Sequence, residues 1–119
     1  MKSYRDLEIY QLAYQQAIEV HDMTMLLPKY ELYEQGSQIR RSSKSIKDNI
    51  AEGYGRKRYK AEFIRFLIFA HSCYETLSQL NMISDIHFPG NPLTILISKY
   101  ELLGKKINKF IQYVDDNWK

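Results

Sequence analysis

Basic side chains gather in one stretch of the sequence, and their chemistry suits phosphate groups. Residues 36–60 carry eight lysines and arginines against two acidic residues, whereas the rest of the chain carries nine basic and twelve acidic residues. Cations that neutralise phosphates release counterions, which gives salt-sensitive binding to nucleic acid of any sequence. The predicted phosphate contacts are Arg40, Arg41, Lys44, Lys47, Arg56, Lys57, Arg58 and Lys60.

Two aromatic rings lie among these charges and extend the predicted chemistry to bases. Tyr54 and Tyr59 flank the basic run at 56–58, and a tyrosine beside cations can stack on an unpaired base. The sequence holds no zinc-finger, RNP or GXXG signature that would read a base sequence. We therefore expect nucleic-acid binding that is largely without sequence specificity, with structured RNA or an RNA–DNA intermediate favoured. The alternatives are a merely solvated basic face, or a structural scaffold whose basic surface binds an acidic protein partner.

The Gly53-Tyr54-Gly55 stretch offers a second way to hold an anion. Successive backbone amides in a glycine-rich turn can form an anion-binding nest, and the start of the next helix adds a positive dipole. The GxxxxGK[ST] spacing of a Walker loop is absent. The simpler interpretation, which we favour, is that Gly53 or Gly55 takes the left-handed conformation that ends a helix before a hairpin turn.

Polar residues at helical spacing predict a hydrogen-bonded network between helices. Ser42, Ser45, Asn49 and Glu52 repeat at steps of three and four, and Glu75 lies four residues after a histidine. A di-metal bundle site needs Glu-x-x-His pairs on two helices, and this spacing is absent, so we expect neither a metal nor another cofactor. We expect Asn49, Glu52 and Glu75 to form a structural polar network that fixes the register of neighbouring helices.

Catalysis finds little support in the sequence. The three histidines are scattered at positions 21, 71 and 87, and no Ser–His–Asp or Cys–His–Asp grouping can be assembled from them. Glu52 and Glu75 could form an acid–base pair, but the interior of a helical bundle lacks an obvious substrate cleft. We therefore expect no catalytic residues and no enzymatic activity.

Cysteine usage and hydropathy bear on where the protein works. The single cysteine, Cys73, excludes an internal disulfide, and it lies in an apolar run that predicts a buried, inert thiol. The chain shows no signal-peptide pattern and no apolar run of about 18–20 residues. We expect a cytoplasmic protein with no membrane association.

Apolar periodicity and scarce turn residues predict an all-α protein with one domain over residues 1–119. Steps of three and four from Leu7 to His21 predict a first helix, which ends at Pro28. A single helical turn is expected near residues 31–33. Further helices are predicted over 37–52, with Ser37 as the N-cap, over 59–85, and over 93–118 after the HFPGNP loop. Short connections between these helices predict an antiparallel up-down four-helix bundle.

More apolar surface is present than one bundle core can hold. Ile64, Ile68 and Phe69 widen the apolar face of the third helix beyond one stripe. Further aromatic residues of the kind enriched at interfaces are Tyr30, Tyr33 and Tyr113. A single bundle that exposed all of them would be prone to aggregation, so we expect homo-oligomers.

The sequence also resembles a known family. The run GSQIRRSSKSIKDNIAEGYGR, followed by EFIRFLIFAHSCYETLSQL, is similar to the four-helix bundle proteins of 23S rRNA intervening sequences, whose superfamily includes the accessory variability proteins of diversity-generating retroelements. The most specific part is NIAEGYGR, at residues 49–56. The resemblance implies a left-handed up-down bundle that assembles into a ring-shaped homopentamer, and it implies architecture better than function. The chain differs from many relatives at Tyr59, where the third helix often has a serine or threonine cap, and at His71, often a glycine.

Overall fold

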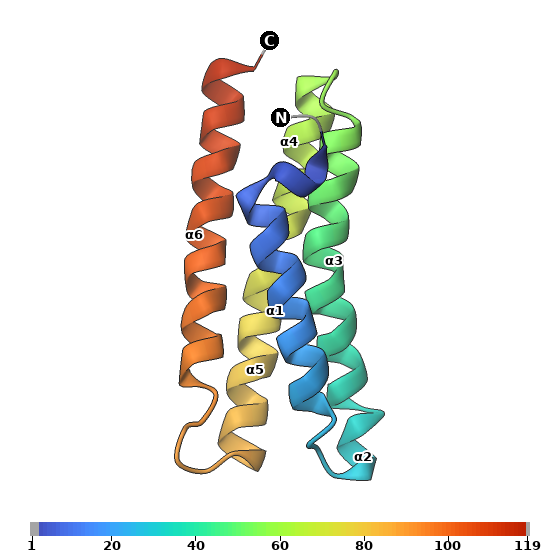
Figure 1. Ribbon diagram of the computed structural model, residues 1–119, viewed down its shortest axis with the longest axis vertical. Helices are drawn as coiled ribbons and strands as arrows, with labels where there is room; N and C mark the ends of the chain where they lie inside the picture. Colours follow the sequence, from blue (N-terminus) through green and yellow to red (C-terminus); the bar gives the residue numbers. More distant parts are fainter. Residues whose placement is uncertain (1–2, 119) are drawn as a thin grey trace.

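Four long helices form the protein in a computed structural model that describes residues 3–118 (Figure 1). The first is α1 (Glu8–Thr24) and the second is α3 (Gln35–Gly55). The third is built from α4 (Lys60–Phe69) and α5 (Cys73–His87), which the 3-10 turn η2 (Ala70–Ser72) joins, and the fourth is α6 (Thr94–Asn117). Two short pieces, η1 (Tyr4–Asp6) and α2 (Lys29–Leu32), complete the described chain, and none of its residues lies in a β-strand.

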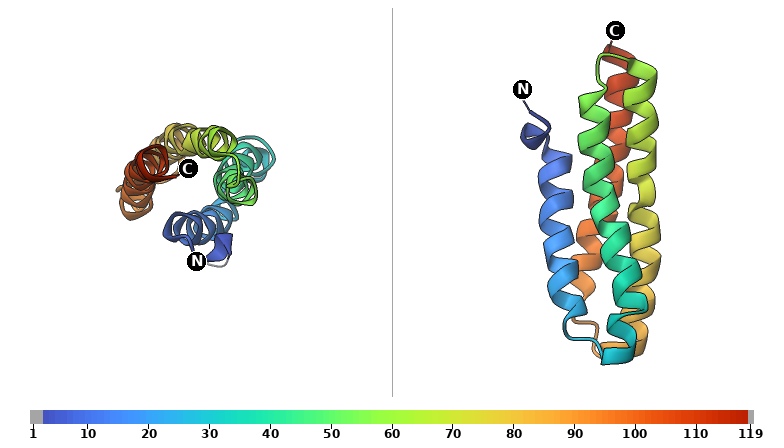
Figure 2. Two further views of the ribbon diagram at one scale, coloured as in Figure 1. Left: turned by 90° about the horizontal axis from the view of Figure 1, so that it is seen from above. Right: turned by 90° about the vertical axis from the view of Figure 1, so that its right-hand side faces the viewer.

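The long helices alternate in direction and close into a bundle of 48 × 23 × 20 Å (Figure 1). α1 packs on α3, α3 packs on α4 and α5, and both of these pack on α6, which returns to α1. Figure 2 shows this arrangement from above, with each long helix beside two others. The predicted all-α class with four helices is thereby confirmed.

One continuous core holds the helices together. Its largest fully buried side chains include Tyr100, Phe63, Ile39, Ile46 and Ile50. The three isoleucines recur at steps of seven and four along α3, so one narrow stripe of this helix faces inward. Burying each such side chain contributes roughly 1.5–3 kcal/mol relative to leaving it exposed. No helix within residues 3–118 is long and apolar enough to span a membrane.

The start of α3 differs from the prediction. The helix begins at Gln35, and its N-cap residue, Glu34, makes no side-chain capping bond. Ser37 therefore lies inside the first turn, and its prediction as the N-cap was wrong. The chain passes almost directly from α2 into α3, because Gly36 allows a close approach: a Cβ there would lie 3.1 Å from the carbonyl oxygen of Glu31.

The end of α3 also differs, because both glycines remain helical. α3 runs through Gly53 to Gly55, and the only glycine with positive φ among residues 3–118 is Gly90. The Arg56 amide closes the helix by donating to the Gly53 carbonyl at 3.0 Å. The predicted left-handed glycine cap was therefore wrong. The nest hypothesis fails with it, since amides inside a regular helix are directed along its axis and do not converge on an anion.

Close packing explains one of these glycines. A Cβ on Gly53 would lie 3.1 Å from the Cβ of Phe66 and 3.3 Å from the carbonyl oxygen of Phe63, so α4 approaches α3 at this point. A Cβ on Gly55 would meet nothing within 4 Å. The turn into α4 then occupies residues 56–59.

The third predicted helix is interrupted in its middle. η2 tightens the backbone at residues 70–72, so the expected continuous helix over 59–85 consists of two α-helices of nearly common direction. The tightened turn lies beside α3, where the hydroxyl oxygens of Ser72 and Ser45 are 3.0 Å apart. His71 lies in this turn, with its ring edge-on to Tyr74 at 5.8 Å.

Candidate nucleic-acid interface

The eight predicted phosphate contacts divide among three places along α3 and the turn after it. Arg40 lies where the end of α1, the short α2 and α3 meet, and α2 is at the lower end of the bundle in Figure 1. Arg41, Lys44 and Lys47 lie further along α3, where they border two different grooves, and the other four, Arg56, Lys57, Arg58 and Lys60, lie on the turn into α4. The eight cations therefore differ in their surroundings.

Arg40 is engaged inside the fold. Its Nη1 donates to the Thr24 hydroxyl at 2.8 Å and its Nη2 donates to the Leu32 carbonyl at 2.9 Å. These bonds tie the end of α1 and the short α2 to α3 and leave the guanidinium half-buried. The assignment of Arg40 as a phosphate contact is corrected to a structural role.

Lys44 and Lys47 lie on the side of α3 that faces α1. Lys47 Nζ is 2.7 Å from Asp48 Oδ1 and 5.9 Å from the centre of the Tyr14 ring. Partial burial acts to lower the pKa of Lys47, but the hydrogen bond and charge of Asp48 outweigh it and raise the pKa above its usual value. Lys44 is exposed and forms no ion pair with any residue of the described chain. This side of α3 therefore keeps its positive charge near neutral pH.

Arg41 lies one step around α3 from Lys44, next to the side of the helix that faces α5. It borders a polar groove of 390 Å³ whose other lining residues are Gln38, Ser42, Ser45, Glu75 and Gln79. Arg41 is exposed and forms no ion pair within residues 3–118, although Glu75 lines the same groove. Hydroxyl and amide groups dominate the groove beside it.

Two cations of the α3–α4 turn are paired. Arg56 reaches Glu52 at 3.1 Å and Glu62 at 3.2 Å, and its guanidinium lies 4.9 Å from the centre of the Phe66 ring. Lys60 donates to the backbone carbonyl of Asp115 on α6. Exposed ion pairs of this kind contribute only about 0–1 kcal/mol to folding, but they reduce the charge that is available to a ligand.

The remaining two cations of the turn stack on tyrosines. Lys57 Nζ lies 3.8 Å from the centre of the Tyr54 ring, and the Arg58 guanidinium lies 5.9 Å from that of Tyr59. Neither cation has an acidic partner within residues 3–118. Trp118 fixes the turn from below, since its indole Nε1 donates to the Lys57 carbonyl at 2.8 Å. Lys57 and Arg58 are thus held on an ordered turn with their charges uncompensated.

The two tyrosines of the turn differ in access. Tyr59 is 62% exposed, so its ring can meet a base. Tyr54 is only 8% exposed and packs edge-on to Phe63 at 6.4 Å. Tyr54 is therefore part of the core, and its assignment as a stacking residue is corrected.

A polar network does join α3 to α5, but through other residues than those predicted. Ser42 is buried; its hydroxyl donates to Gln79 Oε1 at 2.8 Å and accepts from Thr76 at 2.9 Å. The hydroxyls of Ser45 and Ser72 form a second link at 3.0 Å. Serine, threonine and glutamine at steps of four and three along residues 72–79 were the sequence signal for this network.

The three residues predicted for that network lie elsewhere. Asn49 donates to the carbonyl of Ser45 on its own helix at 2.8 Å, and Glu52 pairs with Arg56. Glu75 is exposed at the edge of the polar groove and makes no hydrogen bond to any described residue. The structure does not bring Asn49, Glu52 and Glu75 together.

Groups that could react or bind a metal are sparse. Within residues 3–118, no three histidine, cysteine or acidic side chains lie close enough to hold a metal ion. Cys73 is fully buried against α6, where its Sγ would be 3.2 Å from a Cβ placed on Gly104. Burial raises the pKa of the Cys73 thiol to about 11, which suppresses its reactive thiolate form.

The sequence did not reveal two sets of aromatic rings that lie close to cations. Arg65 lies over both Phe66 and Phe69, with its guanidinium 4.7 and 5.4 Å from the two ring centres. On α1, Tyr10 and Tyr14 contact each other at 6.0 Å between ring centres. An apolar stripe at helical spacing does not reveal such rings, because the same spacing describes core residues.

The chain is similar to a known protein family. The model of the 23S rRNA-intervening sequence protein family matches residues 5–109. The chain belongs to this family. The expected resemblance is thereby confirmed. No curated protein matches the sequence.

The matched region begins in η1 and extends well into α6. It includes all eight predicted phosphate contacts and Tyr14, and it leaves out the last turns of α6 with Trp118. The family match therefore covers the helices that carry the candidate interface.

Proposed function

We propose that this chain is a non-catalytic, cytoplasmic nucleic-acid-binding protein that works as a homo-oligomer. The observation that carries the proposal is that four of the eight predicted phosphate contacts have no acidic partner in residues 3–118: Arg41, Lys44 and Arg58 are exposed, and Lys57 is partly exposed. Cations compensated by phosphates in place of carboxylates give affinity through counterion release. Tyr59, exposed beside Arg58, adds a ring on which a base can stack.

The proposed binding tolerates sequence. Phosphate contacts position a nucleic acid but do not read it, and bases are distinguished through hydrogen bonds to their edges. The cations lie on helix sides and on a turn, and none is buried in a pocket that could enclose a base edge. RNA is favoured because its loops and bulges present unpaired bases to aromatic rings.

Assembly into a homo-oligomer is supported by the outer face of the third helix. Ile68, Phe69, Met82 and Ile86 are each about half exposed along α4 and α5. Solvent contact of so many large apolar side chains is unfavourable, and a second copy would cover them. The proposed number of five rests on the family resemblance alone. Repeated cations around a ring would raise avidity for a long nucleic acid without any new contact.

A salt series tests the proposal. Binding of a generic structured RNA and of a duplex DNA is measured for the wild-type chain and for the double variant Lys57→Ala/Arg58→Ala. The control, Lys29→Ala/Lys105→Ala, removes the same charge from exposed positions on α2 and α6. Light scattering first establishes that all three proteins assemble alike.

We expect micromolar or tighter binding that weakens steeply with salt. The double variant should bind more weakly, with a salt slope shallower by about two, whereas the control should differ much less. Absence of binding at low salt would refute the nucleic-acid function. An acidic protein partner would then become the leading alternative, with its affinity concentrated in one or two arginine or aromatic anchors.

A further inference from the structure

Two surface grooves meet at the ring of Tyr14. One groove, of 280 Å³, runs between α1 and α3 and is lined by Tyr14, Ala17, Ile18, His21, Lys44 and Lys47. The other, of 420 Å³, lies toward the start of α1 and is lined by Arg5, Tyr10, Gln11, Tyr14 and Gln15. The shared ring makes the two grooves one track along the outer surface of α1.

The track is positively charged without compensation from its own walls. Its lining includes the cations Arg5, Lys44 and Lys47 and no acidic residue. Of these cations, only Lys47 forms an ion pair with a described residue, Asp48. This charge pattern suits an anionic ligand that extends over both grooves.

The Tyr14 ring is supported and accessible at the same time. It is 48% exposed, and Tyr10 lies behind it at 6.0 Å with the two ring planes tilted by 37°. Tyr4 supports Tyr10 edge-on at 4.8 Å, and both of these rings pack against the core. A ring that is already fixed loses little rotamer freedom when a planar ligand stacks on it.

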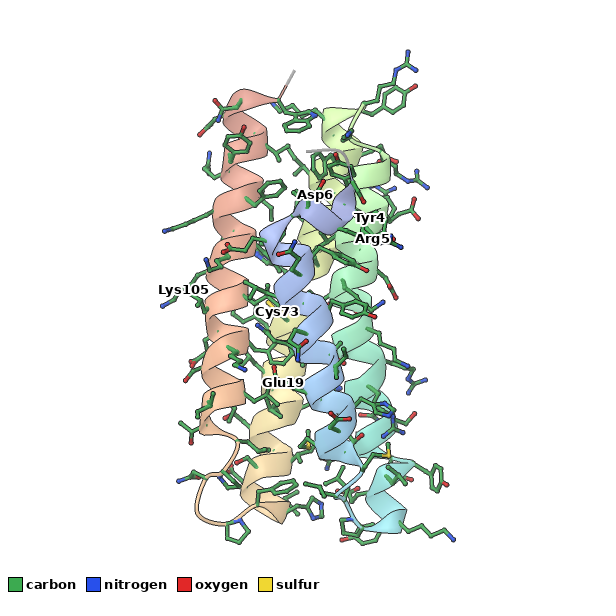
Figure 3. All side chains as sticks on the ribbon, in the orientation of Figure 1. Tyr4, Arg5, Asp6, Glu19, Cys73 and Lys105 are labelled. Carbon is green, nitrogen blue, oxygen red and sulfur yellow. The ribbon has the colours of Figure 1, made fainter. Side chains whose placement is uncertain are left out.

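The neighbouring charges also suit an anion. Burial raises the pKa of Tyr10 above its usual value, so its phenol stays neutral near physiological pH and does not repel phosphates. Arg5 lies over the Tyr4 ring at 5.6 Å, near the start of α1 in Figure 3. Cations are thus present on both sides of the exposed ring.

Resting on the proposed function, we propose that this track is a binding site for single-stranded nucleic acid. An unpaired base stacks on Tyr14 beside Ile18, and phosphates on either side of that base meet Lys44 in one groove and Arg5 in the other. Bases in a duplex are already stacked on each other, so the site selects unpaired nucleotides. The recognition is for the nucleotide class and not for one base, since every base has a stacking face.

The other aromatic surface of the molecule is less suited to this role. Arg56 and Arg65 already lie over Phe66, and Glu62 holds both guanidinium groups through ion pairs of 3.2 and 2.7 Å. A base would have to displace these cations to reach the ring. At Tyr14 the nearest cation, Lys47, lies 5.9 Å from the ring centre, and it is held by a carboxylate at one side.

Fluorescence anisotropy with labelled oligonucleotides tests the site. The probes are a single-stranded oligouridine of about 12 nucleotides and a blunt duplex of the same length, chosen because single-strand sites span roughly 4–16 nucleotides. The variants are Tyr14→Leu, which keeps apolar bulk but removes the ring, and Lys44→Gln. Their matched controls are Tyr113→Leu, whose ring on α6 is 52% exposed, and Lys105→Gln. Light scattering must first show that Tyr113→Leu assembles like the wild type, because Tyr113 is a predicted interface residue. Lys105 projects from α6 on the other side of the molecule from Arg5 (Figure 3).

We expect Tyr14→Leu to weaken oligouridine binding about 5- to 100-fold, with much less effect on the duplex. Lys44→Gln should weaken both and reduce the salt slope by about one. The two controls should bind like the wild type. Equal effects of Tyr14→Leu and Tyr113→Leu on oligouridine would overturn the site.

The outcomes separate this site from the broader function. If the wild type binds both probes with a steep salt slope while Tyr14→Leu leaves binding unchanged, phosphate binding is supported and the Tyr14 site is refuted. If the wild type binds neither probe, both proposals fall. If Tyr14→Leu changes the assembled mass in light scattering, the track is an interface between copies of the chain, and the single-strand site is again refuted.

Discussion

Polar residues on the two sides of α3 differ in whether they are bonded within the chain. On the side facing α5, Ser42 and Ser45 bond to Thr76, Gln79 and Ser72, so the hydrogen-bonding groups are used within the chain. On the side facing α1, Lys44 has no ion pair within residues 3–118, and Lys47 extends beside the half-exposed ring of Tyr14.

This difference follows from chemistry and depth. Small neutral hydroxyls can be buried between helices when each finds a partner, and such bonds specify how two helices align. Long cationic side chains resist burial and keep their charged ends in water. One side of α3 therefore holds the bundle together, while the other remains available to a ligand. Substitutions should accordingly affect stability on one side and binding on the other.

The largest expected effect concerns Arg40, which breaks the simple division because it is a cation that stabilises the fold. Arg40→Ala should lower the free energy of unfolding by about 3 kcal/mol, since it removes two hydrogen bonds from a charged donor and leaves the Leu32 carbonyl unpaired. Lys44→Ala should change it by less than about 0.5 kcal/mol. Urea denaturation followed by circular dichroism measures both. Equal effects of the two substitutions would contradict the structural role of Arg40.

Alkaline pH should lower the free energy of unfolding through ionisation of Cys73. The folded state raises the pKa of Cys73 from 9.0 to about 11, so the neutral thiol contributes stability that is fully present below pH 9. That contribution is lost as the pH rises toward 11, because the unfolded chain gains the thiolate first. The full contribution is on the order of 3 kcal/mol.

The control for this pH dependence is Cys73→Ala. Urea denaturation between neutral pH and pH 11 should show a shallower loss for this variant. The loss should not vanish, because burial, with the charge of Glu19 acting in the same direction, also raises the pKa of Tyr100. Identical slopes for variant and wild type would show that Cys73 is not the group responsible.

Two glycines of α3 differ in how closely neighbouring residues approach them. Gly53→Ala places a Cβ 3.1 Å from Phe66 Cβ, and overpacking of this kind costs about 1–3 kcal/mol, partly offset by better helix propensity. Gly55→Ala meets open space and should stabilise the helix by about 0.5–1 kcal/mol. We expect the two variants to differ by about 2 kcal/mol in urea denaturation. A stabilising Gly53→Ala would mean that α4 can move away without cost.

The sequence predicted the four helices correctly but some of their ends wrongly. It also located the basic residues without showing which of them are free to bind a ligand. Apolar periodicity alone defines the four helices, because the stripe of Ile39, Ile46 and Ile50 has a single helical interpretation. The same residue types did not reveal that Gly53 serves close packing, since a glycine near a helix end fits a left-handed cap equally well. Only the position of α4 distinguishes the two.

Candidate site residues were harder to predict for a related reason. Arg40 and Lys44 lie four residues apart and share one helix side, yet one meets the Leu32 carbonyl and the other meets water. The spacing of Tyr14 matches the apolar stripe of α1, so the sequence alone does not distinguish its half-exposed ring from a core residue. Such distinctions depend on contacts between segments distant in the sequence, and no local pattern contains them.

The coupling between two buried hydroxyls tests the side of α3 that faces α5. Ser42→Ala should cost about 1–2 kcal/mol of unfolding free energy, because it leaves the buried Thr76 hydroxyl with a single weak bond of 3.3 Å to the Ser72 carbonyl. Thr76→Val should cost a similar amount. In the double variant both partners are apolar, so the combined cost should fall short of the sum by about 0.5–1 kcal/mol. A double-mutant cycle in urea measures this coupling, and oligouridine binding by the same variants should stay at the wild-type level. Additive costs would mean that the two hydroxyls do not interact, and weakened binding would mean that the two sides of α3 are not independent.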